Sequence, residues 1–379
     1  WEYMVYDQLD RPILTQDKEL KDQGKWLFTK YDALGRPVYS GLFSNTSNRA
    51  SLQTTVDNYI SGNTSNLSNK ESRTTTVSTI GGVNMNYSNN AYPTTSLEVL
   101  SVNYYDNYNF IDSDKPTTPT AILTQSVTTR TQGLPTAIWS KTLGATTWTK
   151  SYTYYDEKGS AIYVYEKNHL GGYTDSKTKL DFRRKVESTT TVHKRLSSSS
   201  GLTITDRFEY DHAERPTAHY QTVNGNPEQR ITKMTYDELG ILTKKELGGT
   251  GGIAYQTLDY SYNIRGSLSK VNDVDNMGSD LFAYELNYQT GEGTYFNAPQ
   301  YNGNISQMVW KSARNNIKKS YYYDYDYLNR LTKGRYGEGT GLISNWEKFE
   351  VNISGYDHNG NITGLTRKGA SSGSIIDNL

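Results

Sequence analysis

Residues 31–37 read Tyr-Asp-Ala-Leu-Gly-Arg-Pro, a polar phrase that separates two runs of alternating apolar and polar residues. The aspartate can accept hydrogen bonds from backbone N–H groups two residues further on, as in an Asx-turn. The glycine supplies the positive φ that such a turn needs, and the alternating runs on either side are typical of half-buried strands. The phrase therefore predicts a strand, a tight turn and a second strand.

The same motif recurs far more often than chance allows. There are nine Tyr-Asp dipeptides where the composition predicts about two, and copies that begin at residues 210, 236 and 262 follow one another every 26 residues. A fixed period of this length is the signature of a repeat architecture. The motif residues are Tyr6, Asp7, Arg11, Tyr31, Asp32, Gly35, Arg36, Tyr105, Asp106, Tyr155, Asp156, Gly159, Tyr210, Asp211, Arg215, Tyr236, Asp237, Gly240, Tyr325, Asp326, Arg330, Tyr356, Asp357 and Gly360.

We interpret the motif as a structural feature of the repeats. The arginine that follows the turn can stack on a tyrosine, or pair with an aspartate, of the neighbouring repeat. Stacked repeats contact mainly their neighbours, so contacts of this kind would hold the array together. Histidines at variable motif positions (His212 and His358), and His169 in a His-Leu-Gly-Gly phrase, are interpreted as turn residues.

The composition favours strands and excludes several kinds of site. Tyrosine is abundant, with 33 residues in 379, and its ring can be buried while its hydroxyl stays in contact with water. The chain has no cysteine, which excludes disulfides and thiolate metal sites. Basic and acidic residues number 40 each, so electrostatics gives no reason to expect a nucleic-acid partner. No apolar run reaches the roughly 18 residues of a spanning helix, so we expect no membrane span.

The motif and its period resemble those of a known family. A Tyr-Asp-x-x-Gly-Arg phrase repeated about every 25 residues resembles the RHS/YD-repeat family, which includes polymorphic toxins, the shell component of insecticidal toxin complexes and the teneurins. The resemblance covers nearly all of the chain. Phrases at residues 100–108, 168–172 and 356–363 are similar to those of large secreted or cell-surface members from Bacteroidetes-type bacteria.

The resemblance implies an all-β fold in which strand-turn-strand units spiral into a large hollow β-barrel or shell. In many members the shell encloses a C-terminal toxin or effector domain, and some members release it with an aspartic-protease-like site located after the repeats. That segment is not found in residues 1–379, so no catalytic residue is assigned. The resemblance also implies secretion or display at the cell surface, with an outer-membrane secretion apparatus as a candidate partner.

The repeats divide the chain into five segments. Residues 44–96 are rich in Ser, Thr and Asn, so they are expected to form either polar edge strands with long loops or a flexible insertion. The predicted segments are YD repeats in 1–43, the polar segment 44–96, YD-like repeats in 97–196, a short linker-like tract in 197–201 and YD repeats in 202–379. We expect the chain to be a section of a longer protein whose repeats continue beyond it.

Two further stretches resemble ligand-binding patterns. Residues 273–278 begin like a calcium loop, but Met277 stands at the fifth position and Tyr284 stands where the bidentate glutamate belongs, so no metal is expected. Residues 321–327 contain five tyrosines that could form a platform on which a sugar or a base stacks. In the alternative that we favour, alternate rings face opposite sides of one strand and serve sheet packing.

Two functional hypotheses follow from these patterns. The leading one is structural: the chain is part of a shell that encloses or presents another polypeptide, either its own C-terminal domain or a separate one. The alternative is a cell-surface module that binds a glycan or a protein through exposed tyrosine and asparagine side chains. A polysaccharide-acting enzyme would need a convergent acidic pair, for which the sequence gives no evidence. We therefore expect no enzyme activity, catalytic residue, cofactor or metal.

Overall fold

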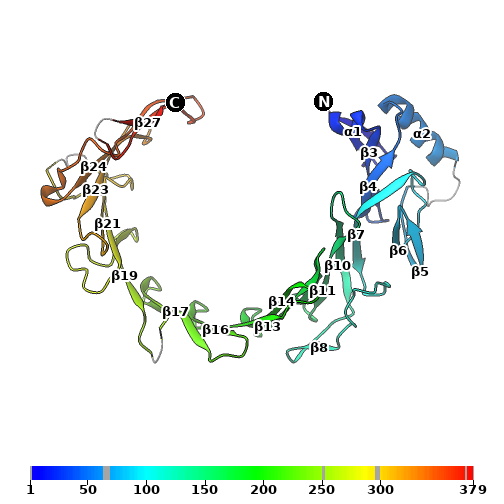
Figure 1. Cartoon of the computed structure of the whole chain (residues 1–379), viewed down its shortest axis with the longest axis horizontal. Helices are drawn as coiled ribbons and strands as arrows, with labels where there is room; N and C mark the ends of the chain where they lie inside the picture. Colours follow the sequence, from blue (N-terminus) through cyan, green and yellow to red (C-terminus); the bar gives the residue numbers. More distant parts are fainter. Residues whose placement is uncertain (1, 63–68, 250–251, 295–298, 372–373, 379) are drawn as a thin grey trace. The chain divides into compact units, whose positions relative to one another are not determined.

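Antiparallel strands that pair with their neighbours in the sequence make up most of the chain (Figure 1). The computed structural model describes residues 2–62, 69–249, 252–294, 299–371 and 374–378. The chain divides into two compact units, Trp1–Phe208 with Gln221–Pro227, and Glu209–Tyr220 with Glu228–Leu379. The predicted all-β fold of tandem strand-turn-strand units is confirmed.

The first unit is a meander in which β4 pairs with β7, and β7 with β10, because two hairpins (β5–β6 and β8–β9) stand apart from the main sheet. Its elements are β1 (Tyr3–Tyr6), β2 (Pro12–Gln16), α1 (Lys18–Asp22), β3 (Lys25–Tyr31), β4 (Pro37–Ser44), α2 (Arg49–Gly62), β5 (Arg73–Ile80), β6 (Val83–Tyr87), β7 (Leu97–Asp106), β8 (Ala121–Ile122), β9 (Gln125–Ser126), β10 (Thr131–Lys141), β11 (Trp148–Tyr155), β12 (Ala161–Lys167), β13 (Gly171–Leu180) and β14 (Val186–Leu196).

The boundary between the units falls within β15 (Leu202–Tyr210) and β16 (Pro216–Val223). The second unit continues as a meander in which each strand pairs antiparallel with the next. Its elements are β17 (Gln229–Tyr236), β18 (Leu242–Leu247), β19 (Gln256–Tyr262), β20 (Leu268–Val271), β21 (Phe282–Asn287), β22 (Gln307–Ser312), β23 (Lys319–Tyr325), β24 (Leu331–Glu338), the short 3-10 helix η1 (Thr340–Leu342), β25 (Val351–Tyr356), β26 (Ile362–Lys368) and β27 (Ile375–Asn378).

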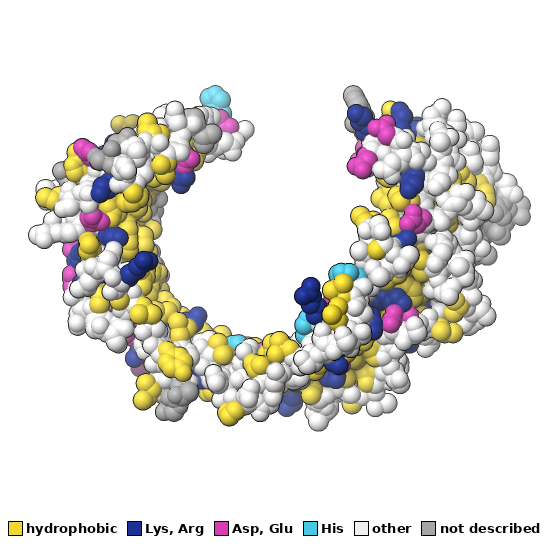
Figure 2. Space-filling model, viewed as in Figure 1, with side chains coloured by type: hydrophobic (Ala, Val, Ile, Leu, Met, Phe, Trp, Pro, Cys, Tyr) yellow, Lys and Arg dark blue, Asp and Glu magenta, His cyan; other side chains and the backbone are white. Residues whose placement is uncertain are grey.

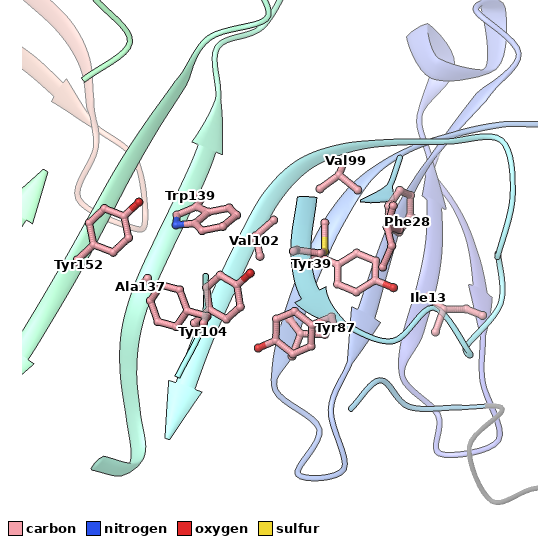
Figure 3. Close-up of a cluster of buried hydrophobic side chains, with 14 of the residues drawn as sticks. Ile13, Phe28, Tyr39, Tyr87, Val99, Val102, Tyr104, Ala137, Trp139 and Tyr152 are labelled. Carbon is pink, nitrogen blue, oxygen red and sulfur yellow. The ribbon is translucent and has the colours of Figure 1, made fainter. Parts of the chain in front are cut away.

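An aromatic core fills the first unit (Figure 3). The ring of Tyr104 stacks on Phe110, with centroids 4.2 Å apart, and on Tyr87 at 5.2 Å. The edge of Trp139 meets the ring of Tyr104 at 5.0 Å. Burial raises the pKa of Tyr104 to about 12, and its hydroxyl accepts a hydrogen bond from the backbone N–H of Asn86. Tyrosine can therefore build this core because each buried hydroxyl finds a polar partner.

Residues 44–96, predicted as polar edge strands or a flexible insertion, lie between the paired strands β4 and β7 and contain a helix that the prediction did not include. The segment contains α2, which begins after Asn48, whose side chain accepts a hydrogen bond from the N–H of Ser51 at 2.9 Å. Leu52, Val56 and Ile60 are spaced four residues apart and are buried, so packing stabilises a helix of low intrinsic propensity. The surface over α2 in Figure 2 is mostly white because its exposed side chains are largely neutral and polar. Part of the predicted segment, residues 63–68, lies outside the described residues.

The tract 197–201 also differs from the prediction of a linker. It forms the connection of the β14–β15 hairpin, where the backbone N–H of Ser199 donates to the carbonyl of Leu196 at 3.1 Å. The Ser199 hydroxyl accepts a hydrogen bond from the N–H of Leu196 in return. Small polar residues are as suited to a hairpin turn as to a linker, so composition alone did not distinguish the two.

The second unit has a smaller core than the first. Its buried cluster consists of Val274, Met277, Ala283, Val309, Tyr322 and Leu342. Among the described residues between 171 and 262, Ala218 is the only buried apolar side chain, and most strand residues there are half-buried. In each unit, the strands of this range are therefore stabilised by pairing between strands more than by burial in a core. Within the described part of the chain, no helix has both the length and the apolar character to cross a membrane.

Candidate functional site

Each motif turn is closed by the side chain of one residue. In the turn between β3 and β4, Oδ1 of Asp32 accepts hydrogen bonds from the backbone N–H groups of Leu34 and Arg36, both at 2.9 Å. The N–H of Gly35 donates to the carbonyl of Asp32 at 3.1 Å, and Gly35 has a φ of +77°. The register of the hairpin shifts at this point. The turn is thus a type I turn followed by a left-handed bulge residue.

The same geometry recurs in both units. The residue three places after the acceptor is always left-handed, and it is glycine in most copies but Asp10, Arg184, Glu214 or Asn329 in the others. Two copies use asparagine, Asn168 and Asn263, which a count of Tyr-Asp dipeptides misses although the side-chain oxygen is the same kind of acceptor. The acceptors are Asp7, Asp32, Asp156, Asn168, Asp181, Asp211, Asp237, Asn263, Asp326 and Asp357.

Arginine and tyrosine side chains join one repeat to the next. The guanidinium of Arg36 lies 4.4 Å from the centroid of the Tyr105 ring and donates to both carboxylate oxygens of Asp106, at 2.8 and 2.5 Å. The hydroxyl of Tyr105 donates to the carbonyl oxygen of Pro37 at 3.1 Å. The Arg-Pro end of one motif therefore contacts the Tyr-Asp start of the following motif. We call this set of contacts the Arg–Tyr seam.

The Arg–Tyr seam recurs along the chain. Cation–ring distances are 4.7 Å for Arg11 and Tyr31, 4.6 Å for Arg215 and Tyr236, and 4.5 Å for Arg330 and Tyr356. The hydroxyls of the same tyrosines donate to the carbonyls of Pro12 at 2.9 Å, Pro216 at 2.8 Å and Leu331 at 2.5 Å. Each arginine also donates to the aspartate of its own turn, as Arg330 does to Asp326 at 2.7 Å. One guanidinium thus fixes a turn and contacts the neighbouring repeat.

The copy at Tyr105 and Asp106 departs from the pattern because a long loop, not a tight turn, follows β7. The Asp106 carboxylate accepts the N–H of Gly133 at 2.7 Å in addition to the two bonds from Arg36. Hydrogen bonding from Arg36 holds the pKa of Asp106 below its usual value of 3.8. Tyr155 keeps the hydroxyl contact of the motif, donating to the carbonyl of Pro135 at 2.6 Å.

The tyrosines of residues 321–327 pack within the sheet. The ring of Tyr321 stacks on Trp310, with centroids 5.7 Å apart, and on Tyr323 at 6.1 Å. Tyr322 faces the opposite side of β23 and is buried in the small core of the second unit. Tyr327, in the motif turn, is fully exposed. The alternation of buried and half-buried rings along one strand is the arrangement that sheet packing predicts.

The calcium-like stretch 273–278 is occupied by a basic side chain of the protein. Nζ of Lys318 lies 2.7 Å from Oδ1 of Asp275 and 2.8 Å from Oε1 of Glu292. An ammonium group therefore neutralises the carboxylates at this place. In the residues that the structure describes, no three histidine, cysteine, aspartate or glutamate side chains come together in a group that could hold a metal ion.

A pocket of about 440 Å³ lies in the first unit between the β5–β6 hairpin and the β10–β11 strands. Trp139 and Trp148 form part of its wall, and Asn84, Asp112 and Lys150 supply polar groups. Nζ of Lys150 lies 2.7 Å from Oδ1 of Asp112, and the same ammonium lies 4.7 Å from the Trp139 ring. The pocket thus combines indole surface with both donors and acceptors.

Comparisons with known proteins give only distant structural similarities. No family model and no curated protein match the chain. It is similar to a crystal structure of TcdB2-TccC3-Cdc42, with 10% identity and a TM-score of 0.26 over 98% of this chain and 19% of that chain. For a crystal structure of TcdB2-TccC3-TEV the identity is 10% and the TM-score 0.20, over 99% and 27% of the two chains. The chain spans less than a third of either structure, and TM-scores this low support no conclusion about function.

Proposed function

We propose that the chain is a structural section of a larger secreted or cell-surface RHS-type protein. In this proposal the repeats form part of a wall that encloses or presents another polypeptide, such as a C-terminal toxin or effector domain, and they carry out no catalysis. The observation that carries the proposal is the half-buried sheet of residues 171–262, in which Ala218 is the one buried apolar side chain among those described. A wall with water or cargo on both faces needs strands of this kind.

The Arg–Tyr seam explains how such a sheet stays ordered without a core. Four motif arginines contact the following motif through a cation–ring contact, and the tyrosine that each one meets donates its hydroxyl back to a carbonyl beside the arginine. Arg36 adds charged hydrogen bonds to Asp106. In a quasi-one-dimensional array, stability is the sum of such neighbour contacts, so the array can extend as far as the motif is repeated. Stability that comes from contacts between neighbouring repeats therefore favours a wall whose length is set by the number of repeats.

The experiment uses the full-length protein from its native source. Limited proteolysis of the intact protein should leave a polypeptide outside the repeats protected, and the Arg215→Ala, Arg330→Ala double variant should expose it to the protease. Lys18→Ala, on the exposed surface of α1, is the matched control and should leave protection unchanged. Electron microscopy that reveals a solid particle without an interior space would overturn the proposal, as would equal digestion of wild type and the double variant.

A second candidate function is binding of a surface glycan, and the pocket lined by Trp139 and Trp148 favours it. Indole rings pack against the apolar faces of sugars, while amide, carboxylate and ammonium groups bind hydroxyls. Trp148→Ala should abolish retention on a glycan array while leaving the circular dichroism spectrum unchanged. Trp346→Ala, at a half-exposed position in the second unit, is the control. Equal retention of both variants would exclude this role for the pocket.

A further inference from the structure

A buried cluster in the first unit has the composition of a reaction centre. Nζ of Lys30, on β3, lies 2.9 Å from Oε1 of Glu71, and neither side chain has any solvent-exposed surface. The same Nζ lies 2.5 Å from Oδ1 of Asn89, in the segment after β6. An amine, a carboxylate and a carboxamide from three distant parts of the chain therefore meet at one point.

Asn89 is held with its carbonyl towards the lysine. Its Nδ2 donates to the backbone carbonyl of Thr94 at 2.8 Å, which turns Oδ1 to the amine. The Tyr39 hydroxyl lies 3.5 Å from the same Oδ1, and the Tyr39 ring lies beside the ammonium, 5.2 Å from Nζ to the centroid. The Tyr39 hydroxyl donates to the backbone carbonyl of Ser88 at 2.9 Å, so the amide carbon has an amine on one side and a hydroxyl group near its oxygen.

Glu71 is fixed beside this pair. Its Oε1 accepts the N–H of Ala91 at 3.0 Å, and its Oε2 accepts the N–H of Asn90 at 2.8 Å and the hydroxyl of Ser88 at 2.6 Å. The residues that hold the carboxylate flank Asn89 in the chain, so the acid and the carboxamide are positioned by the same loop. A carboxylate in this place can exchange protons with the lysine.

We propose that Lys30 and Asn89 form an intramolecular isopeptide bond, with Glu71 as the group that transfers protons and the Tyr39 hydroxyl next to the developing oxyanion. The structure holds the side chains as reactants. The product is a covalent amide between β3 and the segment that connects β6 to β7.

The reaction is a transamidation. Glu71 takes one proton from the Lys30 ammonium, and the neutral amine forms a bond to Cγ of Asn89, whose carbonyl electrons move to Oδ1. The tetrahedral intermediate then expels Nδ2, which leaves as ammonia with a second proton from the attacking nitrogen. Two protons leave the lysine nitrogen, one to ammonia and one to Glu71. The products are the amide, ammonia and protonated Glu71, and no oxidant or reductant is consumed.

The environment favours this reaction in three ways. Burial lowers the pKa of Lys30, against the opposing effect of Glu71, and so makes the neutral nucleophile more accessible. The fold already holds the amine beside the amide, so the reaction does not include the entropy cost of bringing the two groups together. Exclusion of water protects the product from hydrolysis.

The bond would give the chain a cross-link that it cannot obtain otherwise. The chain has no cysteine, and the link would close a loop that contains the whole of α2 and the β5–β6 hairpin. Closing a long loop stabilises a fold by restricting the unfolded chain. A buried ion pair alone contributes little net stability, because desolvation of both charges offsets their attraction. The proposed cross-link would explain why the lysine and the glutamate are buried, which the ion pair alone does not.

Peptide mapping of the full-length protein tests the proposal directly. Trypsin cuts neither before proline nor after an acylated lysine, so a cross-linked Lys30 lies in the fragment 26–49 and Asn89 in the fragment 74–130. A free Lys30 gives the two fragments 26–30 and 31–49 instead. We expect one cross-linked species that contains both fragments and is lighter than their sum by one ammonia. Fragmentation must place the link at Lys30 and Asn89, because a succinimide at an Asn-Gly pair also loses ammonia but joins no peptides.

Variants identify the role of each group. Glu71→Gln should give the separate fragments 26–30, 31–49 and 74–130, since the proton acceptor is lost while the shape is kept, and Asn89→Ala should also prevent the link. Asn90→Ala, the adjacent residue, should still cross-link. Separate, unmodified fragments 26–30, 31–49 and 74–130 from the wild-type protein would overturn the proposal whether or not any variant folds. A link from Lys30 to fragment 71–73 with loss of water would also overturn it, because Glu71 would then be the electrophile.

Discussion

At the scale of single residues, one backbone conformation decides what can stand in a motif turn. Gly35 has a φ of +77°, a region that costs most residues free energy because Cβ approaches the neighbouring carbonyl. Asp10 and Asn329, whose short polar side chains tolerate this region best after glycine, have φ values of +56° and +62° at the equivalent place. Arg184 and Glu214 stand there in two other copies, at +72° and +68°. The variability of this motif position in the sequence therefore reflects tolerance of one conformation by several residue types.

Replacing Gly35 by alanine should reduce the free energy of unfolding by about 1 to 2 kcal/mol, through backbone strain alone. Space is not the cause, because an added Cβ would meet only the Arg11 side chain at 3.9 Å. Gly62→Ala at the end of α2, where φ is not in the left-handed region and no atom lies within 4 Å, should be close to neutral. Urea unfolding of both variants measures the difference, and equal effects would contradict the argument.

The Arg36–Asp106 contact should make the free energy of unfolding depend on pH in the acid range. The pKa of Asp106 is lowered in the folded protein, mainly by hydrogen bonding from Arg36, so its contribution is fully present above the usual value of 3.8. The contribution is lost as the pH falls through the lower, folded pKa. Asp106→Asn should therefore be less stable than wild type at neutral pH and should approach it in strong acid. Denaturant unfolding across this range measures the gap, and a gap that widens in acid would refute the assignment.

At the scale of elements, the hairpins could be predicted from the sequence and α2 could not. Each hairpin is specified locally, since the Asp32 carboxylate and the positive φ of Gly35 lie within a few residues of each other. Leu52, Val56 and Ile60 are the only strong helical signal in a polar segment, and tertiary packing stabilises the helix. The meeting of Lys30, Glu71 and Asn89 was missed for the same reason, because it depends on how the segment that contains α2 folds back on β3.

Leu52→Ala should therefore cost about 2 to 5 kcal/mol of unfolding free energy, as expected for truncation of a buried leucine. The side chain is 1% exposed and belongs to the main hydrophobic cluster of the first unit. Thr54→Ala, on the exposed face of the same helix, should change stability by a few tenths of a kcal/mol, in the direction of helix propensity. Thermal unfolding followed by circular dichroism would separate the two. Similar losses in both variants would mean that the helix does not depend on its packed face.

At the scale of the whole molecule, stability is unevenly distributed. The first unit buries many large aromatic side chains, among them Trp26, Tyr104 and Trp139, whereas the cluster of the second unit has six residues. Strands without a core on either face depend on neighbour contacts and open more easily. Repeats that are similar in sequence are therefore stabilised differently in the two units.

Amide hydrogen exchange should reveal this difference. Backbone N–H groups of β3, β4, β7 and β10 are expected to exchange slowly, and those of β17 and β18 considerably faster, because local opening there exposes little apolar surface. Mass spectrometry of peptides from the folded protein measures both sets in one experiment. Uniform exchange rates would mean that the array unfolds only as a whole.

The arginines of the Arg–Tyr seam lie on the β1–β2, β3–β4, β15–β16 and β23–β24 connections, and each reaches a tyrosine at the end of the next strand but one in the sheet. The connections in between differ in character, from the β2–β3 connection that contains α1 to the β24–β25 connection that contains η1. New sequence inserted there would leave every seam contact in place. The array is therefore a scaffold in which one set of connections holds the repeats together and another set can accept inserted sequence, and grafted peptides belong on the second set.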